Sequence, residues 1–151
     1  MSKYTITRKC GHAETIQIYG KVSGRDNQAA YEQTKLCYEC YKAEQSAKRA
    51  AESHNAAEAA KSSGLPALVG SDKQIAWAET IRAAALAEIE PLRETMEKVP
   101  QDHPNIKSAK SALEIINKVA GRASAKDWID TRATAYDRAW LSAETKKAME
   151  T

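Results

Sequence analysis

All three cysteines of the chain, together with one histidine, form a pattern that can bind a metal ion. Cys10 and His12 belong to a Cys-Gly-His tripeptide, and Cys37 and Cys40 form a Cys-x-x-Cys pair. Three thiolates and one imidazole make a complete tetrahedral ligand set for a structural Zn²⁺. Gly11 accepts the backbone angles that a tight knuckle between the first two ligands requires. The pattern therefore predicts a structural zinc site with no open position for a substrate.

Other uses of these residues are weaker interpretations. The odd number of cysteines argues against a closed disulfide framework. A redox Cys-x-x-Cys normally follows a strand of an α/β domain, whereas residues 31–36 favour a helix or a loop. An iron–sulfur cluster usually takes four cysteines, and a small zinc hydrolase or nuclease requires one ligand to be replaced by water. His54, in a polar alanine-rich segment, and His103, in an expected turn, are poor additional ligands.

Composition and charge restrict the class of protein. The chain has 151 residues, of which 28% are charged, and its mean hydropathy of −0.61 is typical of a soluble protein. It shows no apolar run long enough to cross a bilayer and no signal peptide, so we expect a cytoplasmic protein with reduced thiols and no membrane partner. Residues 1–42 carry seven basic and four acidic side chains, which accounts for the whole net charge of +3. This excess is weak support for nucleic-acid binding.

The alternation of polar and apolar residues on both sides of Cys-Gly-His predicts a β-hairpin with the first two ligands at its turn. In the second predicted strand, for example, Ile16 and Ile18 share one face. Residues 25–36 favour a short helix, and the Cys-x-x-Cys pair is expected to open a longer one. We therefore predict a treble-clef-like zinc module over residues 1–42, with a helix inserted between the two ligand pairs.

The rest of the chain is predicted to be helical. Residues 43–63 are rich in Ala, Glu, Lys and Gln, which favours a solvated helical spacer or a partly disordered linker. Residues 64–151 show apolar residues three and four positions apart, as in a small helical bundle. Ser71 and Gln74 are expected to form a capping box at the first bundle helix. The predicted fold class is mainly α with a small β-hairpin, a long Ala-rich helix and a C-terminal helical bundle.

Two further residues are expected to set helix boundaries in the bundle. Pro91 lacks a backbone N–H, so it should kink the first bundle helix or split it after about Glu90. Ser142 is expected to cap a last short helix that ends at Met149.

No pattern in the chain indicates catalysis. The sequence lacks a nucleophile elbow, a glycine-rich phosphate loop and an acidic metal cluster, so we expect no enzymatic activity. Trp and Arg are favoured in protein interfaces and at stacked bases. The candidates for contacts with a partner or a nucleic acid are Lys9, Lys21, Arg25, Lys73, Gln74, Trp77, Arg82, Trp128 and Arg132. The structural alternative is that the tryptophans lie in the core and that Arg82 and Arg132 pair with Glu79 and Asp130.

Four motifs of the chain resemble those of one protein family. They are Cys-Gly-His, Leu36-Cys-x-x-Cys-Tyr41, Gly70-Ser-x-Lys-Gln-Ile-Ala-Trp-Ala-Glu79 and Ser124-Ala-Lys-x-Trp-Ile-Asp-x-Arg132. Together they are similar to a family of uncharacterised small zinc-binding proteins of bacteria, phages and other mobile elements. The resemblance covers most of the chain except the Ala-rich spacer. The chain departs from the family at Asp127, where members have a second Trp.

The resemblance implies metal binding and an origin in a phage or mobile element, and it implies no particular reaction. We therefore predict a non-enzymatic, zinc-stabilised protein of the bacterial host cytoplasm that binds a host or phage protein. A protein of a mobile element could in this way inhibit a bacterial defence system. The alternative is a nucleic-acid-binding accessory protein that uses the basic zinc module, and a homodimer is compatible with the expected helical bundle.

Overall fold

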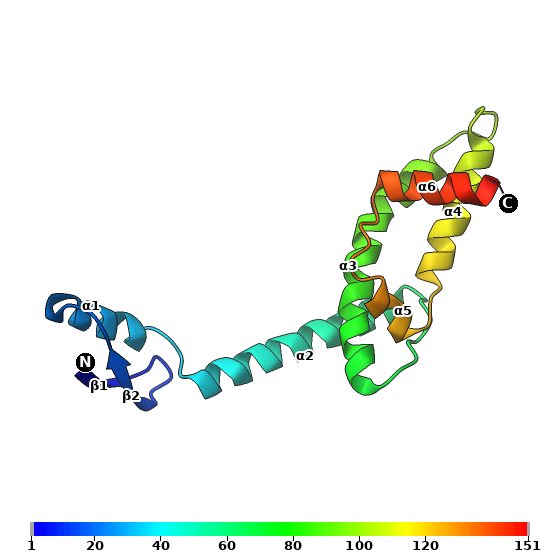
Figure 1. Cartoon of the computed structure of the whole chain (residues 1–151). Coiled ribbons are helices and arrows are strands. Elements are labelled where there is room, and N and C mark those ends of the chain that lie inside the picture. Colours follow the sequence, from blue (N-terminus) through cyan, green and yellow to red (C-terminus); the bar gives the residue numbers. More distant parts are fainter. Residues whose placement is uncertain (1, 151) are drawn as a thin grey trace. The chain divides into compact units, whose positions relative to one another are not determined.

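The computed structural model describes residues 2–150, and most of them are helical (Figure 1). The elements in chain order are β1 (Ser2–Thr7), β2 (Ala13–Ile18), α1 (Val22–Gln33), α2 (Tyr38–Ser62), α3 (Asp72–Glu97), α4 (Ile106–Ala120), α5 (Ala125–Asp130) and α6 (Arg138–Met149). The predicted fold class, mainly α with an N-terminal β-hairpin, is confirmed. The chain divides into two compact units, which we call unit 1 (up to Arg49) and unit 2 (from Ala50), and the division falls inside α2.

None of the described helices is both long enough and apolar enough to span a membrane.

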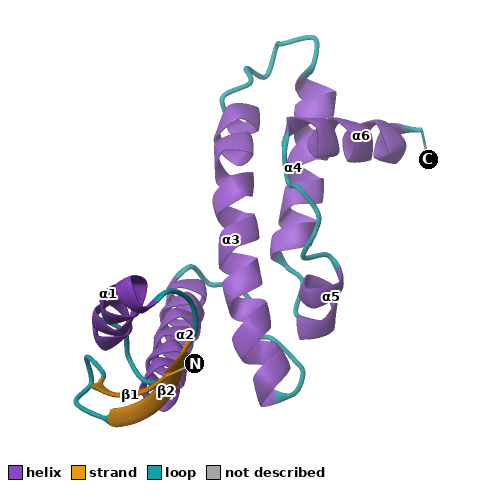
Figure 2. Ribbon diagram, turned by 60° about the vertical axis from the view of Figure 1, so that its left-hand side comes forward, coloured by secondary structure: helices purple, strands orange, loops and turns teal. Residues whose placement is uncertain are grey.

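Unit 1 is built on an antiparallel hairpin covered by one helix. Strands β1 and β2 pair in a register that places Tyr4 opposite Ile16. Because side chains alternate along a strand, this register brings the apolar residues of both strands to one face. Ile6 and Ile18 on that face are buried against Ala29 of α1, and Figure 2 shows α1 beside the two strands. The predicted alternation is therefore confirmed, and it produces a very small core.

Helix α1 covers Val22–Gln33, whereas the sequence predicted a helix over residues 25–36. The helix ends early because the chain that follows it forms other contacts. The Thr34 hydroxyl donates to the Tyr31 carbonyl oxygen at 2.7 Å, which closes the last turn. Beyond this turn, the Lys35 carbonyl oxygen accepts a hydrogen bond from the Lys9 N–H at 2.9 Å. The segment before the second ligand pair is thus attached to the hairpin as well as to the end of α1.

Helix α2 runs without interruption through the alanine-rich segment. Of the two alternatives for residues 43–63, the helical spacer is the one that the structure has, up to Ser62. Ala60 is the only buried residue of this helix. Its sequence explains both facts, because Ala, Glu, Lys and Gln favour a helix but offer no large apolar face for burial.

Unit 2 is a helical bundle whose core surrounds Trp128. Helices α3 and α4 lie side by side, with α5 against one end of the pair and α6 across the other (Figure 1, Figure 2). Trp128, Ile89 and Ile116 are fully buried. The indole N–H of Trp128 donates to the Arg122 carbonyl oxygen at 3.1 Å, so the polar atom of this ring is satisfied inside the core.

Helix α3 continues through Pro91 to Glu97, so the alternative of a split after Glu90 is wrong. Proline removes one backbone hydrogen bond and crowds the preceding turn. Ile89 before it is buried in the core, and Leu92 and Met96 after it pack against the same core. Burial on both sides of Pro91 therefore offsets the lost hydrogen bond and keeps the two halves in one helix.

The predicted cap at the start of α3 is confirmed, whereas the predicted cap at the start of α6 is wrong. The capping box at the start of α3 is present: the Gln74 N–H donates to the Ser71 hydroxyl oxygen, and the Gln74 side-chain oxygen accepts from the Ser71 N–H at 3.0 Å. At α6 the prediction is wrong, because Ser142 lies inside the helix. The cap is Asp137, whose carboxylate accepts from the Trp140 N–H at 2.8 Å. An aspartate satisfies the free N–H groups of a helix start as well as a serine does.

Gly70 lies where the entry to α3 passes against the start of α5. The Val69 N–H donates to the Ala123 carbonyl oxygen at 2.7 Å, and the Ala125 N–H donates to the Val69 carbonyl oxygen at 3.0 Å. This short parallel bridge brings the two segments so close that a Cβ atom on Gly70 would lie 3.0 Å from the Ala125 Cβ. Only glycine fits at this position without displacing α5.

We predict that Gly70→Ala destabilises unit 2 by about 1–3 kcal/mol, because the added methyl group overpacks this contact. Denaturant unfolding followed by tryptophan fluorescence measures the effect, since all three tryptophans lie in unit 2. Gly24→Ala is the control, because a Cβ at Gly24 meets no atom within 4 Å and the residue belongs to unit 1. An unchanged unfolding midpoint in Gly70→Ala would contradict the close approach.

Candidate metal centre

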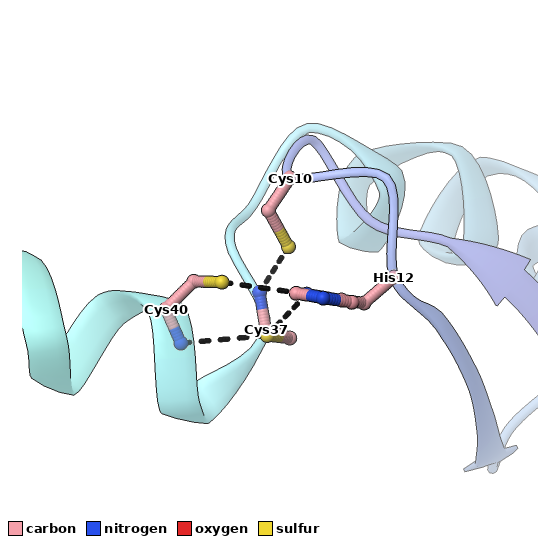
Figure 3. Close-up of side chains that lie close together, drawn as sticks. All are labelled: Cys10, His12, Cys37 and Cys40. Atoms are coloured by element: carbon pink, nitrogen blue, oxygen red, sulfur yellow. Dashed lines mark hydrogen bonds between the residues drawn. The ribbon is translucent and has the colours of Figure 1, made fainter.

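Four donor atoms converge between the turn of the hairpin and the start of α2 (Figure 3). The sulfur atoms of Cys10, Cys37 and Cys40 and a ring nitrogen of His12 all lie within 4.8 Å of one another. His12 Nδ1 is 3.4 Å from Cys37 Sγ and 3.3 Å from Cys40 Sγ. A tetrahedral ion bound to sulfur at about 2.3 Å and to nitrogen at about 2.0 Å places its donors about 3.5–3.8 Å apart. The structure thus brings all four predicted ligands into an arrangement that can hold one metal ion.

The first ligand pair is fixed by a tight turn after β1. The Arg8 N–H donates to the His12 carbonyl oxygen at 2.9 Å, and the Gly11 N–H donates to the Arg8 carbonyl oxygen at 2.8 Å. Gly11 has a φ of +83°, in the region that residues with a side chain rarely adopt. The predicted requirement for glycine between Cys10 and His12 is confirmed.

The second ligand pair is fixed by the start of α2. The Cys37 N–H points at Cys10 Sγ at 3.3 Å, and the Cys40 N–H points at Cys37 Sγ at 3.5 Å. The N–H groups of the first helical turn have no partners within the helix, so they are free to donate to sulfur. Such donors stabilise the thiolate form, which is the form that binds a metal ion.

The thiols differ in their pKa because their surroundings differ. Hydrogen bonds from the backbone N–H groups of Cys37 and His12 lower the pKa of the Cys10 thiol to about 6. The pKa of the Cys40 thiol is raised to about 11, first by its contact with the Cys37 side chain and then by partial loss of solvent. At neutral pH Cys10 is therefore a thiolate and Cys40 a thiol, and a cation that binds Cys40 must displace its proton.

Arg8 joins the hairpin that carries the first ligand pair to the end of α1. Its guanidinium group forms ion pairs with Glu14 of β2 at 2.7 Å and with Glu32 of α1 at 2.6 Å. It also donates to the Glu32 carbonyl oxygen at 2.8 Å, and Lys35 reaches the same carboxylate at 2.8 Å. The Arg8 side chain is only 10% exposed, and these hydrogen bonds raise its pKa above the usual arginine value.

The sequence analysis did not identify Arg8, although the residue stands only two positions before Cys10. That position is the one signal in the sequence that could have indicated a role for Arg8 at the site. Its two carboxylate partners lie on other elements and follow only from the fold.

The three residues of unit 1 that were predicted to contact a partner or a nucleic acid differ in how free their side chains are. Lys9 and Lys21 are exposed. The Arg25 guanidinium, by contrast, donates to the Gly20 carbonyl oxygen at 3.0 and 2.8 Å and to the Ser2 hydroxyl at 2.9 Å. Arg25 therefore ties the open end of the hairpin to α1, and most of its donors are committed to the chain itself.

In unit 2, two of the predicted binding residues are buried and cannot line an exposed face. Trp128 lies in the core, and Arg82 is buried in an ion pair with Glu79 at 2.5 Å. Arg82 also donates to the Pro66 carbonyl oxygen at 2.7 Å. These are the structural roles given above as the alternative, and a buried guanidinium needs such a partner to offset the loss of water.

The other predicted residues of unit 2 lie at the surface. The Trp77 side chain is 51% exposed, and the Arg132 guanidinium lies 5.7 Å from the centre of its ring. The expected pair of Arg132 with Asp130 does not form, because Asp130 pairs with Lys126. Lys73 is exposed as well, while Gln74 is engaged in the capping box.

We predict that metal affinity falls as the pH falls. The pKa of about 11 means that one proton leaves Cys40 on binding at neutral pH, so affinity drops by at least about tenfold for each pH unit. Below about pH 6 Cys10 also becomes protonated, so the metal ion must displace a second proton and its affinity falls more steeply with pH. Competition with a chelator, corrected for the chelator's own protonation, measures this dependence between pH 5 and pH 8, and a pH-independent affinity would rule out thiolate ligation.

We predict that Arg8→Met destabilises unit 1 by about 1–3 kcal/mol, because Glu14 and Glu32 then lose their shared partner. The variant should also bind a metal ion more weakly, since the hairpin that carries Cys10 and His12 is then less firmly attached to α1, which leads into the second ligand pair. Tyrosine and amide NMR signals of unit 1, followed through denaturation and metal titration, measure both effects. Arg138→Met, at an exposed arginine of unit 2, is the matched control. Metal affinity equal to that of the unchanged protein would refute a positioning role for Arg8.

Comparisons with known proteins add no assignment to this geometry. No protein-family model, no curated protein sequence and no solved structure matches the chain. The interpretation of the site therefore rests on its own donor atoms and their surroundings.

Proposed function

We propose that the protein is a non-enzymatic interaction protein whose N-terminal unit is held in shape by a structural Zn²⁺ and binds a macromolecular partner. The observation that carries this proposal is the cluster of three thiols and one imidazole within 4.8 Å. Thiolate-rich tetrahedral sites favour zinc over the harder cations that prefer oxygen. A set of four protein ligands fills the coordination sphere of zinc, as in structural sites, whereas catalytic sites keep one position for water.

The small core of unit 1 supports a structural role for the ion. Among residues 2–49, Ile6, Ile18 and Ala29 are the apolar residues buried together, with Tyr4 and Ile16 partly buried beside them. Units of about 40 residues rarely bury enough apolar surface to fold without a metal ion or disulfides. Zinc binding would supply the missing free energy of folding, as it does in other small metal-dependent modules.

The surface of unit 1 supports a binding function. Large apolar side chains that a larger core would cover are exposed here: Tyr19, Val22, Tyr31, Tyr38 and Tyr41. Two of these tyrosines belong to the first turn of α2, so the metal centre fixes their position. Tyrosine is enriched in protein interfaces, which favours a protein partner. The family resemblance supports a host or phage protein in this role, with inhibition of a bacterial defence system as the biological outcome.

Nucleic-acid binding is the second candidate function. The same exposed tyrosines are suited to stacking on bases, and α2 also carries exposed basic residues, among them Lys42, Lys48 and Arg49. With Lys9 and Lys21 they make unit 1 basic on its surface. Such binding would weaken steeply as salt is added, because cations are released from the phosphates.

We predict one zinc ion per chain by native mass spectrometry. Removal of the ion should unfold unit 1, seen as loss of dispersion in its tyrosine NMR signals, while the tryptophan signals of unit 2 stay unchanged, because the two units have separate cores. A folded unit 1 without any metal would overturn the structural role of zinc.

The partner is tested by affinity capture from bacterial lysate with the zinc-loaded protein. The double variant Tyr38→Ser/Tyr41→Ser should lose the captured protein, whereas Trp77→Ser, at an exposed aromatic residue of unit 2, should retain it. Equal capture by both variants would contradict a binding role for the tyrosines. Capture of nucleic acid that is lost between low and physiological salt would favour the second candidate.

A further inference from the structure

A cavity in unit 2 is lined by basic and aromatic side chains. It has a volume of about 470 Å³ and lies between α4, α6 and the segment that joins α5 to α6. Its lining includes Lys118, Arg122, Thr131, Tyr136, Trp140 and Lys147. The volume lies within the range of pockets for small organic ligands, about 300–1,000 Å³. Neither the metal centre nor the tyrosines of unit 1 contribute to it.

The Arg122 side chain contributes an uncompensated positive charge. Arg8, Arg82 and Arg93, which are at least partly buried, each have a carboxylate within 4.0 Å, whereas the partly buried Arg25 donates to a carbonyl oxygen and a hydroxyl instead. Among residues 2–150, no carboxylate forms an ion pair with Arg122. Its polar contacts are with the hydroxyls of Thr131 and Tyr136, at 3.4 and 3.3 Å, and its guanidinium also lies 5.8 Å from the centre of the Trp128 ring.

Hydrogen bonds of this length are weak, and a charge withdrawn from water without a counter-charge is unfavourable. An anion in the cavity would supply the counter-charge that Arg122 lacks.

The charge of the whole lining has the same sign. Lys118 of α4 and Lys147 of α6 are both among the lining residues, and Glu144 is the one acidic residue among those that line the cavity. With Arg122 the lining therefore carries an excess of positive charge. Cavities lined by one sign of charge concentrate ligands of the opposite sign, because the surrounding protein screens the field poorly.

An aromatic pair forms the apolar part of the lining. The rings of Tyr136 and Trp140 pack edge to face, with their centres 4.9 Å apart. Tyr136 is buried, whereas Trp140 is only partly buried. The indole of Trp140 thus rests on a rigid neighbour and retains an accessible surface at the cavity. A partly exposed indole of this kind is suited to stacking against a flat ring.

We propose that this cavity binds a small organic anion that carries a flat ring, with the size and chemistry of a nucleoside monophosphate. The phosphate would pair with Arg122 and with Lys118 at the rim. The ring would stack on Trp140. The site lies entirely in unit 2, so this inference stands independently of the zinc centre and of the macromolecular partner.

The test is an NMR titration of the full-length, zinc-loaded protein with adenosine monophosphate, followed at the indole N–H of Trp140. The expected result is a saturable shift at Trp140 but not at Trp77, which does not line the cavity. Lys118→Glu should weaken the affinity by about fivefold or more, as expected for the loss of one exposed ion pair. Lys110→Glu is the matched control, because it changes the same charge on an exposed part of α4 outside the cavity.

Four outcomes would overturn the proposal. No saturable shift at Trp140 up to about 10 mM ligand, the weakest affinity of interest, would exclude the site. Equal affinity in Lys118→Glu and Lys110→Glu would show that the rim charge plays no part. Inorganic phosphate alone that binds as tightly as adenosine monophosphate would exclude the ring contact, and adenosine that binds equally well would exclude the anion contact. All these readouts lie in unit 2, so they are separable from a failure of the zinc centre.

Discussion

Three sulfur atoms and one imidazole nitrogen within 4.8 Å are the constraint on which unit 1 depends. Such a cluster does not hold itself together, because a second thiolate beside the first is unfavourable. Backbone N–H groups lower the pKa of Cys10 to about 6, whereas the Cys37 side chain and then partial loss of solvent raise the pKa of Cys40 to about 11, so the two are not both thiolates at neutral pH. A bound cation changes this by stabilising both thiolates at once. With only three residues buried in its core, unit 1 has few other interactions that join its hairpin to α2.

The chain around the cluster is arranged to bring two distant segments into register. The backbone bond between Lys9 and Lys35 joins the segments just before each ligand pair. Arg8 reinforces the same junction through Glu14 and Glu32. These contacts act on the peptide chain rather than on the donor atoms, so they orient the ligands before any ion binds. Preorganisation of this kind lowers the entropy lost on metal binding.

The parts of the fold and of the metal centre that depend on short segments of the chain could be predicted from the sequence. The ligand set follows from residue type and spacing alone, and the hairpin follows from its alternation, because both are properties of short segments. The role of Arg8 depends on carboxylates six and 24 residues away, and the sequence does not indicate that pairing. Ser142 and Asp137 are equally good caps by composition, so only the packing of α6 decides between them.

Trp77 and Trp128 show the same limit of prediction. Both lie on amphipathic helices, yet Trp128 is buried and Trp77 is half exposed. The difference arises from where α5 docks on the bundle, which no local pattern encodes. The cavity beside Trp140 likewise depends on three separate segments that meet only in the fold.

Helix α2 has one consequence for the behaviour of the whole chain. Ala60 is its only buried residue, so side-chain packing contributes little to its stability, and local helix propensity must maintain it. Its amide hydrogens should exchange with solvent faster than those of α3, which packs against a core. Transient opening would also expose its backbone to proteases, and the first cleavage would then separate the two units, each with its own core.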